Sequence, residues 1–372
     1  MPPSQQAPVL IGAERLEAFI AGIFRATGCD GAEAGRIARH LLGANLAGHD
    51  SHGVARVPRY VEWQKAGYVV AGKRAEVVTD GGGFLVLDGG FGFGQTVAPQ
   101  ATALGIERAR EHGTAVIALR NSGHIGRAGA YAEQAIAAGL VSVHFVNVAG
   151  SVMVAPFGGV ERRFSTAPFS VGVPTTPPVV LDFATSRVAE GKVLVASNGG
   201  KPLPSDALIE PDGSLSGDPR TLYGDYERTG QRSAAGGLGA IRAFGEHKGS
   251  GLAFACELLA GALTGGGCAG PVEKRGRIAN GMLSVFISPK RLGTEAEFLR
   301  TAQDYVAWVK SCRPIEPGGE VLAPGEPEAR LRAERLRDGV PLQPDTWSSI
   351  VRCAQGLGVP VPDPAAGSGS AA

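Results

Sequence analysis

Residues 114–138 read TAVIALRNSGHIGRAGAYAEQAIAA, and this stretch decides the fold class. Its first six residues form an apolar run with β-branched side chains, which is typical of a buried strand. A glycine-rich loop follows, and helical spacing resumes from Tyr131 to Ala138. A strand, a glycine loop and a helix in this order predict an α/β layer.

Further apolar runs extend this pattern over the middle of the chain. Residues 84–87, 141–146, 179–181 and 282–287 are short and β-rich, and helical stretches separate most of them. We therefore expect an α/β core. No internal repeat interrupts it, and the polar, glycine-rich stretch 198–245 predicts an extended excursion over the surface that serves as a lid or an interface arm.

Both ends of the chain are predicted to be helical. One apolar face from Leu16 to Phe24 stops at Gly28, and a second helix begins at an Asp30 cap. After residue 294 the helical spacing returns, so we expect the termini to pack together as one lobe. The predicted division is residues 1–80 and 294–366 for that lobe, 81–293 for the α/β core, and 367–372 for a flexible tail.

Composition narrows the classes of partner. Lys and Arg number 36 and Asp and Glu 35, and a net charge of +1 gives no global field to attract nucleic acid or a membrane surface. No run of 18 apolar residues is present, and the first residues lack the features of a signal peptide. The five cysteines form no CxxC pair, so we expect reduced thiols and a cytoplasmic protein.

Residues 50–58, DSHGVARVP, concentrate reactive side chains between helix breakers. An imidazole titrates near neutral pH, and a guanidinium four residues later can hold a carboxylate by two parallel hydrogen bonds. His52 and Arg56 therefore suit chemistry at a carbon next to a carboxylate. The alternative is that His52 caps the helix that begins near Pro58 and that Arg56 is solvated. His49 adds a second imidazole, but no third ligand cluster accompanies a metal site here.

Standard nucleotide signatures are mostly missing. The spacing Gly265, Gly267, Gly270 fits GxGxxG, yet it follows a helical stretch rather than the strand that a dinucleotide fingerprint requires. No Walker-type loop or GxSxG is present. Residues 122–128 lie between a strand and a helix, so their amides could form an anion site for a pyrophosphate, or His124 could simply cap the helix.

Six segments in order along the chain resemble the type-2 malate/L-lactate dehydrogenase family. They are Ser51-His52-Gly53 with Arg56, residues 121–129, Pro156-Phe157-Gly158-Gly159, residues 182–186, His247-Lys248-Gly249, and residues 324–328. The resemblance implies a non-Rossmann mixed β-sheet flanked by helices, a homodimer, no metal, and NADPH or NADH as hydride source. It implies a small carboxylate substrate, with a 2-oxo acid and a 2-hydroxy acid interconverted.

The resemblance also implies roles for single residues. His52 would donate the proton, Ser51 would orient it, Arg56 would pair the substrate carboxylate, and Thr166 would hold a second substrate oxygen. The expected cofactor-binding residues are His124, Ile125, Gly126, Arg127, Ala128, Asp182, Phe183, Ala184, Glu190, Gly191, Lys248, Pro324, Gly325 and Glu326.

Three of these cofactor assignments have plain structural alternatives. Asp182 could cap the following helix instead of holding ribose hydroxyls. Lys248 could be a surface lysine in a first helical turn. Residues 324–328 contain two prolines and a glycine, and could be a rigid turn before a helix.

The chain departs from the family at positions near the expected pocket. Gly-Thr-Asn-Pro is replaced by residues 165–168, Ser-Thr-Ala-Pro, and Tyr-Lys-Gly-Tyr by residues 247–250, His-Lys-Gly-Ser. These changes leave the substrate open and motivate a contrasting hypothesis, a catalytically silent binding protein. Reduction of a 2-imino acid is the other alternative, although Lys192 stands where imine-reducing members are expected to carry an aspartate.

Overall fold

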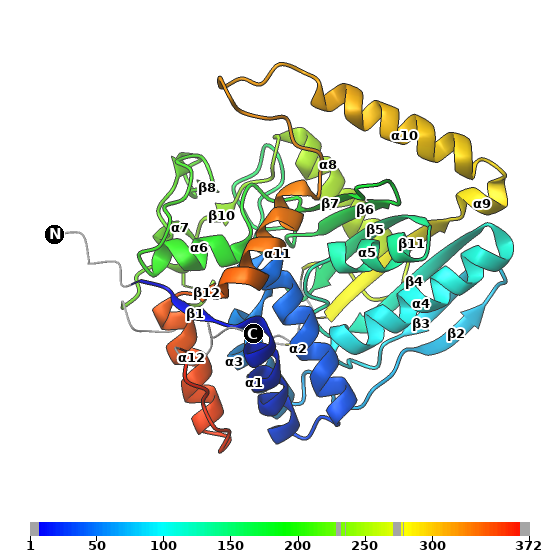
Figure 1. Cartoon of the computed structure of the whole chain (residues 1–372). Helices are drawn as coiled ribbons and strands as arrows, with labels where there is room; N and C mark the ends of the chain where they lie inside the picture. Colours follow the sequence, from blue (N-terminus) through cyan, green and yellow to red (C-terminus); the bar gives the residue numbers. More distant parts are fainter. Residues whose placement is uncertain (1–6, 228–231, 235, 271–276, 278, 365–372) are drawn as a thin grey trace.

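A seven-stranded mixed sheet forms the centre of the protein (Figure 1). The computed structural model describes residues 7–227, 232–234, 236–270, 277 and 279–364. Only β3 and β4 pair in parallel, and the other neighbours are antiparallel. In spatial order the strands are β2 (Glu76–Asp80), β3 (Phe84–Asp88), β4 (Thr114–Ser122), β11 (Ala279–Ile287), β5 (Val141–Ala149), β6 (Pro168–Val173) and β7 (Val179–Ala184).

Helices cover both faces of this sheet. Neighbouring residues of a strand point to opposite faces, so each strand contacts helices on both sides. Val146 shares a buried cluster with α4 (Gly94–His112) and α5 (Gly129–Ala137). Phe145 packs against a different cluster that includes α8 (His247–Cys256). A short π-helix, η3 (Glu257–Ala262), continues α8 toward β11. The prediction of an α/β core flanked by helices is confirmed.

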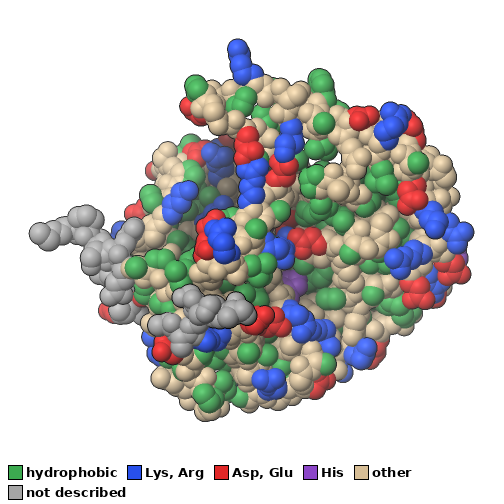
Figure 2. All heavy atoms as spheres, viewed as in Figure 1, with side chains coloured by type: hydrophobic (Ala, Val, Ile, Leu, Met, Phe, Trp, Pro, Cys, Tyr) green, Lys and Arg blue, Asp and Glu red, His purple; other side chains and the backbone are tan. Residues whose placement is uncertain are grey.

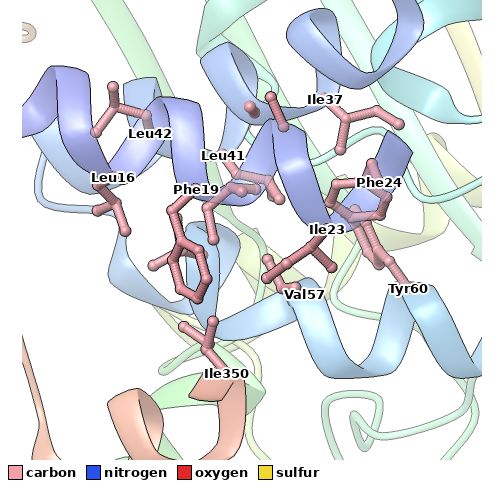
Figure 3. Close-up of a cluster of buried hydrophobic side chains, with 14 of the residues drawn as sticks. Leu16, Phe19, Ile23, Phe24, Ile37, Leu41, Leu42, Val57, Tyr60 and Ile350 are labelled. Atoms are coloured by element: carbon pink, nitrogen blue, oxygen red, sulfur yellow. The ribbon is translucent and has the colours of Figure 1, made fainter. Parts of the chain in front are cut away.

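The two ends of the chain meet in one helical lobe. Strand β1 (Val9–Ile11) pairs with β12 (Val340–Leu342), and α12 (Pro344–Gln355) contacts α3 (Val57–Lys65). Figure 3 shows Ile350 of α12 pointing toward the side chains of α1 (Ala13–Ala26), α2 (Gly31–Leu46) and α3. Asp30 caps α2 as expected, because its side chain accepts from Glu33 N at 2.6 Å. The predicted lobe therefore exists, whereas its residue boundaries stay a prediction.

Helix α10 (Glu295–Lys310) lies apart from this lobe. It follows the short α9 (Pro289–Leu292), runs along the top of Figure 1, and buries none of its residues within the chain. Tyr305 and Trp308 are 62% and 70% exposed. Figure 2 shows the face hollowed beneath this segment. Phe298, Ala302 and Val309, on the apolar stripe that predicted a helix here, are only partly buried.

The stretch from residue 198 to 245 is not the loose excursion expected from its polarity. It carries β8 (Leu208–Ile209), β9 (Leu215–Ser216), α7 (Arg220–Tyr223) and β10 (Ala240–Ile241), and its three strands form a small antiparallel sheet. Leu208, Leu222 and Ile241 are fully buried in the same cluster as α8. A few well-spaced apolar residues are therefore enough to pack the described parts of this stretch onto the rest of the chain.

The surface carries no large field of one sign on the face seen in Figure 2, where basic and acidic side chains are interspersed. This agrees with the balanced composition. In the part of the chain that the structure describes, no helix has the length and apolarity needed to cross a bilayer.

A histidine inside the sheet makes stability depend on pH. His144 of β5 is fully buried between Ser142 and Ser284, with its ring nitrogens 3.0 and 2.8 Å from their hydroxyls. Burial lowers the pKa of His144 from its ordinary 6.5 to about 3. The unfolded chain therefore binds a proton below about pH 6.5 that the folded protein does not take up, so stability is lost as the pH falls from there toward 3.

We expect His144→Gln to flatten this dependence. Urea unfolding at pH 7, 6, 5 and 4 should show the free energy of unfolding falling less steeply in the variant, by roughly 1.4 kcal/mol per pH unit below pH 6. Other buried histidines contribute equally to both proteins, so only the difference in slope is informative. Parallel pH profiles of the two proteins would contradict the assignment.

Candidate active site

Ser51, His52 and Arg56 lie on two consecutive 3₁₀ turns, η1 (Asp50–His52) and η2 (Val54–Arg56), which run directly into α3. Asn45 of α2 holds both turns, because its amide donates to Asp50 Oδ1 at 2.6 Å and accepts from Val54 N at 2.8 Å. A Cβ at Gly53 would lie 2.1 Å from Asn45 Oδ1, so only glycine fits between the turns. The N-cap of α3 is Arg56, so the alternative of His52 as a helix cap is wrong.

His52 is partly buried against two predicted site residues. Ser51 Oγ lies 3.0 Å from His52 Nδ1, and the ring of His124 is stacked on that of His52 with centroids 5.7 Å apart and planes at 11°. Burial, with His124 and Arg56 as further causes, lowers the pKa of His52 well below its ordinary 6.5. The expectation of a half-protonated imidazole at neutral pH is therefore corrected: without a bound anion His52 is neutral.

Arg56 is held rather than solvated. Its Nε donates to the Ser51 carbonyl at 2.6 Å, and one terminal nitrogen lies 3.5 Å from Glu190 Oε2. Glu190 begins α6 (Glu190–Ser197) and accepts a 2.6 Å hydrogen bond from the Tyr223 hydroxyl. A Cβ at the next residue, Gly191, would lie 2.2 Å from Ser51 Cβ. Glu190 and Gly191 thus bring α6 against the His52 turn.

The loop after β4 is tied down by its own amides. Gly123 N donates to Gly92 O, Ile125 N to Asn280 Oδ1, Arg127 N to His40 Nε2, and Gly129 N to Asp182 Oδ2. The interpretation of residues 122–128 as a row of amides free to bind pyrophosphate is therefore not supported, because three of these amides already have acceptors. Gly126, with a φ of 74°, and Ala128 complete the turn between His124 and α5.

Asp182 and Arg127 form a buried polar pair beside that loop. Asp182 Oδ2 accepts from Gly129 N at 2.8 Å and lies 4.0 Å from Arg127 Nη1. The other terminal nitrogen of Arg127, Nη2, lies 2.5 Å from Glu133 Oε2. Burial raises the pKa of Asp182 above its ordinary value, against the opposing effects of His49 and Arg127. Asp182 does not cap α6, whose N-cap is Ala189. Arg127 Nε is a buried donor that lacks an acceptor among the described residues.

Phe183, Ala184 and Thr166 meet where β6 and β7 pair. Ala184 is registered opposite Pro168, Phe183 packs edge-on against Phe244 with centroids 5.2 Å apart, and the Thr166 carbonyl accepts from Thr185 N at 3.0 Å. These contacts place Thr166 next to the end of β7 and leave its side chain half-buried.

The Ser-Thr-Ala-Pro departure has a structural partner in Glu257. The Ser165 hydroxyl donates to Glu257 Oε1 at 2.6 Å, and Asn147 Nδ2 donates to Glu257 Oε2 at 3.0 Å. Ala167 is buried with a φ of 30°, a region that asparagine tolerates better than alanine. Ser165 thus anchors this loop to a buried carboxylate.

The remaining cofactor candidates are Lys248 and the turn at residues 324–326. Lys248 is exposed in the first turn of α8, as its surface-lysine alternative supposed. The Pro324 carbonyl accepts from Val180 N of β7 at 3.1 Å, Gly325 has a φ of 96°, and Glu326 pairs with Lys310. Residues 324–326 are therefore a rigid turn that also touches the strand leading to Asp182.

The described residues contain no group of three or more His, Cys, Asp or Glu side chains arranged for a metal. His49 has a partner elsewhere, because its Nε2 lies 3.6 Å from Glu328 Oε1 of α11 (Glu326–Asp338). The GxGxxG spacing follows the π-helix η3 rather than a strand, as expected.

The chain is similar to known dehydrogenases over nearly its whole length. Residues 11–351 match the sequence model of a family described as malate/L-lactate dehydrogenase. The chain belongs to this family. It is 41% identical over 353 residues to hydroxycarboxylate dehydrogenase B of Escherichia coli K12, covering 94% of each chain, and 36% identical to the L-lactate dehydrogenase of Cupriavidus necator, covering 88% and 91%. The solved malate dehydrogenase of Pyrococcus horikoshii superposes with a TM-score of 0.83 at 26% identity, covering 97% and 99%.

Family membership confirms the resemblance inferred from the six segments, and the mixed sheet agrees with its non-Rossmann fold. Sequence reasoning missed Tyr60, Gln95 and Glu257. Tyr60 and Gln95 contact His124 through hydrogen bonds of 2.6 and 2.9 Å. Nothing in their spacing marked them, because each reads as an ordinary helix residue until the fold brings it to the loop after β4.

Proposed function

We propose that the protein is an NAD(P)-dependent oxidoreductase that interconverts a small 2-hydroxy acid and the corresponding 2-oxo acid. The observation that carries this proposal is the stacked His52–His124 pair beside Arg56. An imidazole next to a guanidinium suits a reaction in which a carboxylate is held while a proton moves on the neighbouring oxygen. The family's dehydrogenases support the same class of reaction.

A nicotinamide cofactor would supply or remove hydride at C2 of the substrate. The orphaned Nε of buried Arg127, next to Asp182, fits such a group because a ribose or phosphate oxygen would satisfy it. We infer that the loop from His124 to Ala128, the end of β7 from Asp182 to Ala184, and the α6 start at Glu190 and Gly191 line its site. Lys248 and the turn at Pro324, Gly325 and Glu326 would contact its outer parts.

The protein's own residues would handle the proton. His52 exchanges it with the oxygen on C2, Ser51 orients the imidazole through the 3.0 Å contact, and Thr166 holds a second substrate oxygen. The depressed pKa of His52 leaves it unprotonated and ready to accept a proton from a hydroxy acid. For reduction, a carboxylate bound at Arg56 offsets one of the charges that lower this pKa, so substrate binding itself favours the protonated form.

Reduction of a 2-imino acid is the second candidate. Lys192, at the position where imine-reducing relatives are expected to have an aspartate, is exposed on α6 and offers no acid to the site. The hydroxy acid is therefore favoured. A catalytically silent binding protein is disfavoured because Ser51, His52 and Arg56 retain mutual contacts that binding alone does not require.

We further infer that the working unit is a homodimer. Two exposed apolar faces support it: Tyr305 and Trp308 on α10, and Phe254 on α8, Leu258 on η3 and Leu263 just after η3, which are 48–67% exposed. Monomeric enzymes rarely leave such faces bare, and two-fold pairing is the commonest assembly of soluble oligomers. The unpaired cysteines agree with a cytoplasmic protein, and no nucleic acid or membrane partner is proposed.

One screen tests the function. NADH and NADPH are titrated while nicotinamide fluorescence is followed, and each is then assayed with a panel of 2-oxo acids and cyclic imines. We expect binding of at least one cofactor and turnover of a 2-oxo acid. Failure of both cofactors to bind at millimolar concentration would overturn the enzyme assignment, and turnover of imines alone would transfer it to the second candidate.

His52→Ala should lower kcat by about 100-fold or more, with nearly unchanged cofactor affinity, because the lost interaction forms chiefly in the transition state. His112→Ala, at the surface end of α4, is the matched control and should behave as the wild type. Near-normal turnover of His52→Ala would move the proton transfer to His124. Arg56→Lys keeps the charge and loses the fork, so its defect should lie mainly in KM for the acid.

The dimer is tested at α10. Light scattering after size exclusion should give about twice the chain mass, and specific activity should fall when the enzyme is diluted below the dimer dissociation constant. Trp308→Lys should shift the protein toward monomer, whereas Leu336→Lys, at a site 57% exposed on α11, should not. A monodisperse wild-type monomer with full activity would refute the homodimer.

A further inference from the structure

Gln95, the second residue of α4, contacts both the backbone and the phenol that hold His124. Its Nε2 donates to the His124 carbonyl at 2.9 Å and to the Tyr60 hydroxyl at 3.2 Å. The Tyr60 hydroxyl in turn lies 2.6 Å from His124 Nδ1. Gln95 and Tyr60 are buried, with 1% and 2% of their surface exposed, so water does not substitute for these contacts.

The direction of the Gln95 amide follows from its partner. A backbone carbonyl only accepts, so the atom 2.9 Å from His124 O has to be the amide nitrogen. Gln95 Oε1 has no hydrogen-bond partner among the described residues. The amide is therefore held by its two N–H groups alone, and the second of them donates to Tyr60.

The neighbours of the Tyr60 hydroxyl determine which atom it donates its proton to. Among the described residues its contacts are Gln95 Nε2, which donates to it, and His124 Nδ1. If Nδ1 carried the imidazole proton, the phenol proton would be left buried without an acceptor, which native structures avoid. The arrangement in which every group is paired has Tyr60 donating to an unprotonated Nδ1.

We propose that Gln95 is a positioning residue that acts through Tyr60 to hold His124 in the tautomer with its proton on Nε2. This inference rests on the proposed function and deepens it. A neutral imidazole with Nε2–H is a fixed hydrogen-bond donor, and its ring is stacked on that of His52. His124 thereby donates to the oxygen on C2, while His52 exchanges the proton with that oxygen.

Gly94 explains how Gln95 reaches this position. A Cβ at Gly94 would lie 2.4 Å from the His124 carbonyl oxygen, so glycine lets the first turn of α4 approach the loop after β4. Gln95 follows at once and is carried against the same carbonyl. The contact between α4 and the loop after β4 therefore places Gln95 against His124, and this placement does not depend on a ligand.

A double-mutant cycle tests the proposal. Gln95→Met, which keeps the length and removes both donors, should lower kcat by at least about 10-fold while KM and cofactor affinity change by less than about 3-fold. In the Tyr60→Phe background the same substitution should lower kcat by clearly less than in the wild type, since only the direct bond from Gln95 to the His124 carbonyl is then left to lose. Gln100→Met, on the same helix but bonded to Ala75 N, is the matched control with normal kinetics. Additive effects of Gln95→Met and Tyr60→Phe would overturn the proposal.

Nuclear magnetic resonance supplies a readout that needs no turnover. In protein labelled with ¹⁵N-histidine, the His124 signals, assigned by their loss in His124→Asn, should show a protonated Nε2 and an unprotonated Nδ1. Gln95→Met should give a mixture of tautomers. A proton on Nδ1 in the wild type would overturn the proposal. A wild type with this tautomer but no turnover of any acid would overturn the proposed function alone.

Discussion

The close approach of α4 to the backbone of His124 is the constraint on which the site depends. The approach requires glycine at position 94 and is secured by the Gln95 amide. Asn280 of β11 holds the same loop from the sheet through Ile125 N, and Tyr131 of α5 donates to Ile125 O at 2.6 Å. The loop after β4 is thus fixed from three elements, so His124 stays at a set distance from His52 without help from a ligand.

The rigid packing around the site buries imidazole rings, and burial lowers their pKa values. Burial lowers the pKa of His124 to about 3 and that of His40 to about 4, and each ring is satisfied by a neutral partner rather than a carboxylate. A charged imidazole in this cluster would face Arg56 and Arg127 as well as its neighbours. Neutral rings therefore leave the positive charge of Arg56 as the feature that attracts an anionic substrate.

The sequence predicted those parts of the fold that depend on local pattern. Apolar runs gave the positions of β3, β4, β5, β7 and β11, but β6 was missed because Pro168 and Gly172 break up its run and its burial alternates. Helical periodicity shows that α10 has an apolar face, yet periodicity cannot say what covers that face, and the expectation that it packs on the terminal lobe did not anticipate its position. Likewise, the polarity of residues 198–245 hid a small folded sheet.

The residues of the candidate site also differ in whether local sequence pattern marks them or only the fold brings them together. Ser51, His52 and Arg56 were predicted because their chemistry is dense within one short segment, whereas Tyr60 and Gln95 matter only through partners that are distant in sequence. The lobe supplies the reacting turns and the sheet supplies the loop after β4.

The C-terminal helix α11 completes this assembly. Arg335 donates to Asp50 at 2.6 and 3.1 Å, and Asp50 also accepts from Asn45, which holds the turns that carry His52. An acidic residue at the start of the reactive segment is thus used for anchoring, and its partner lies 285 residues later in the chain. The pairing of β1 with β12 serves the same end, since it brings α11 to the place where its arginine reaches Asp50. The joining of the termini is therefore part of the active site's construction as well as of the fold's stability.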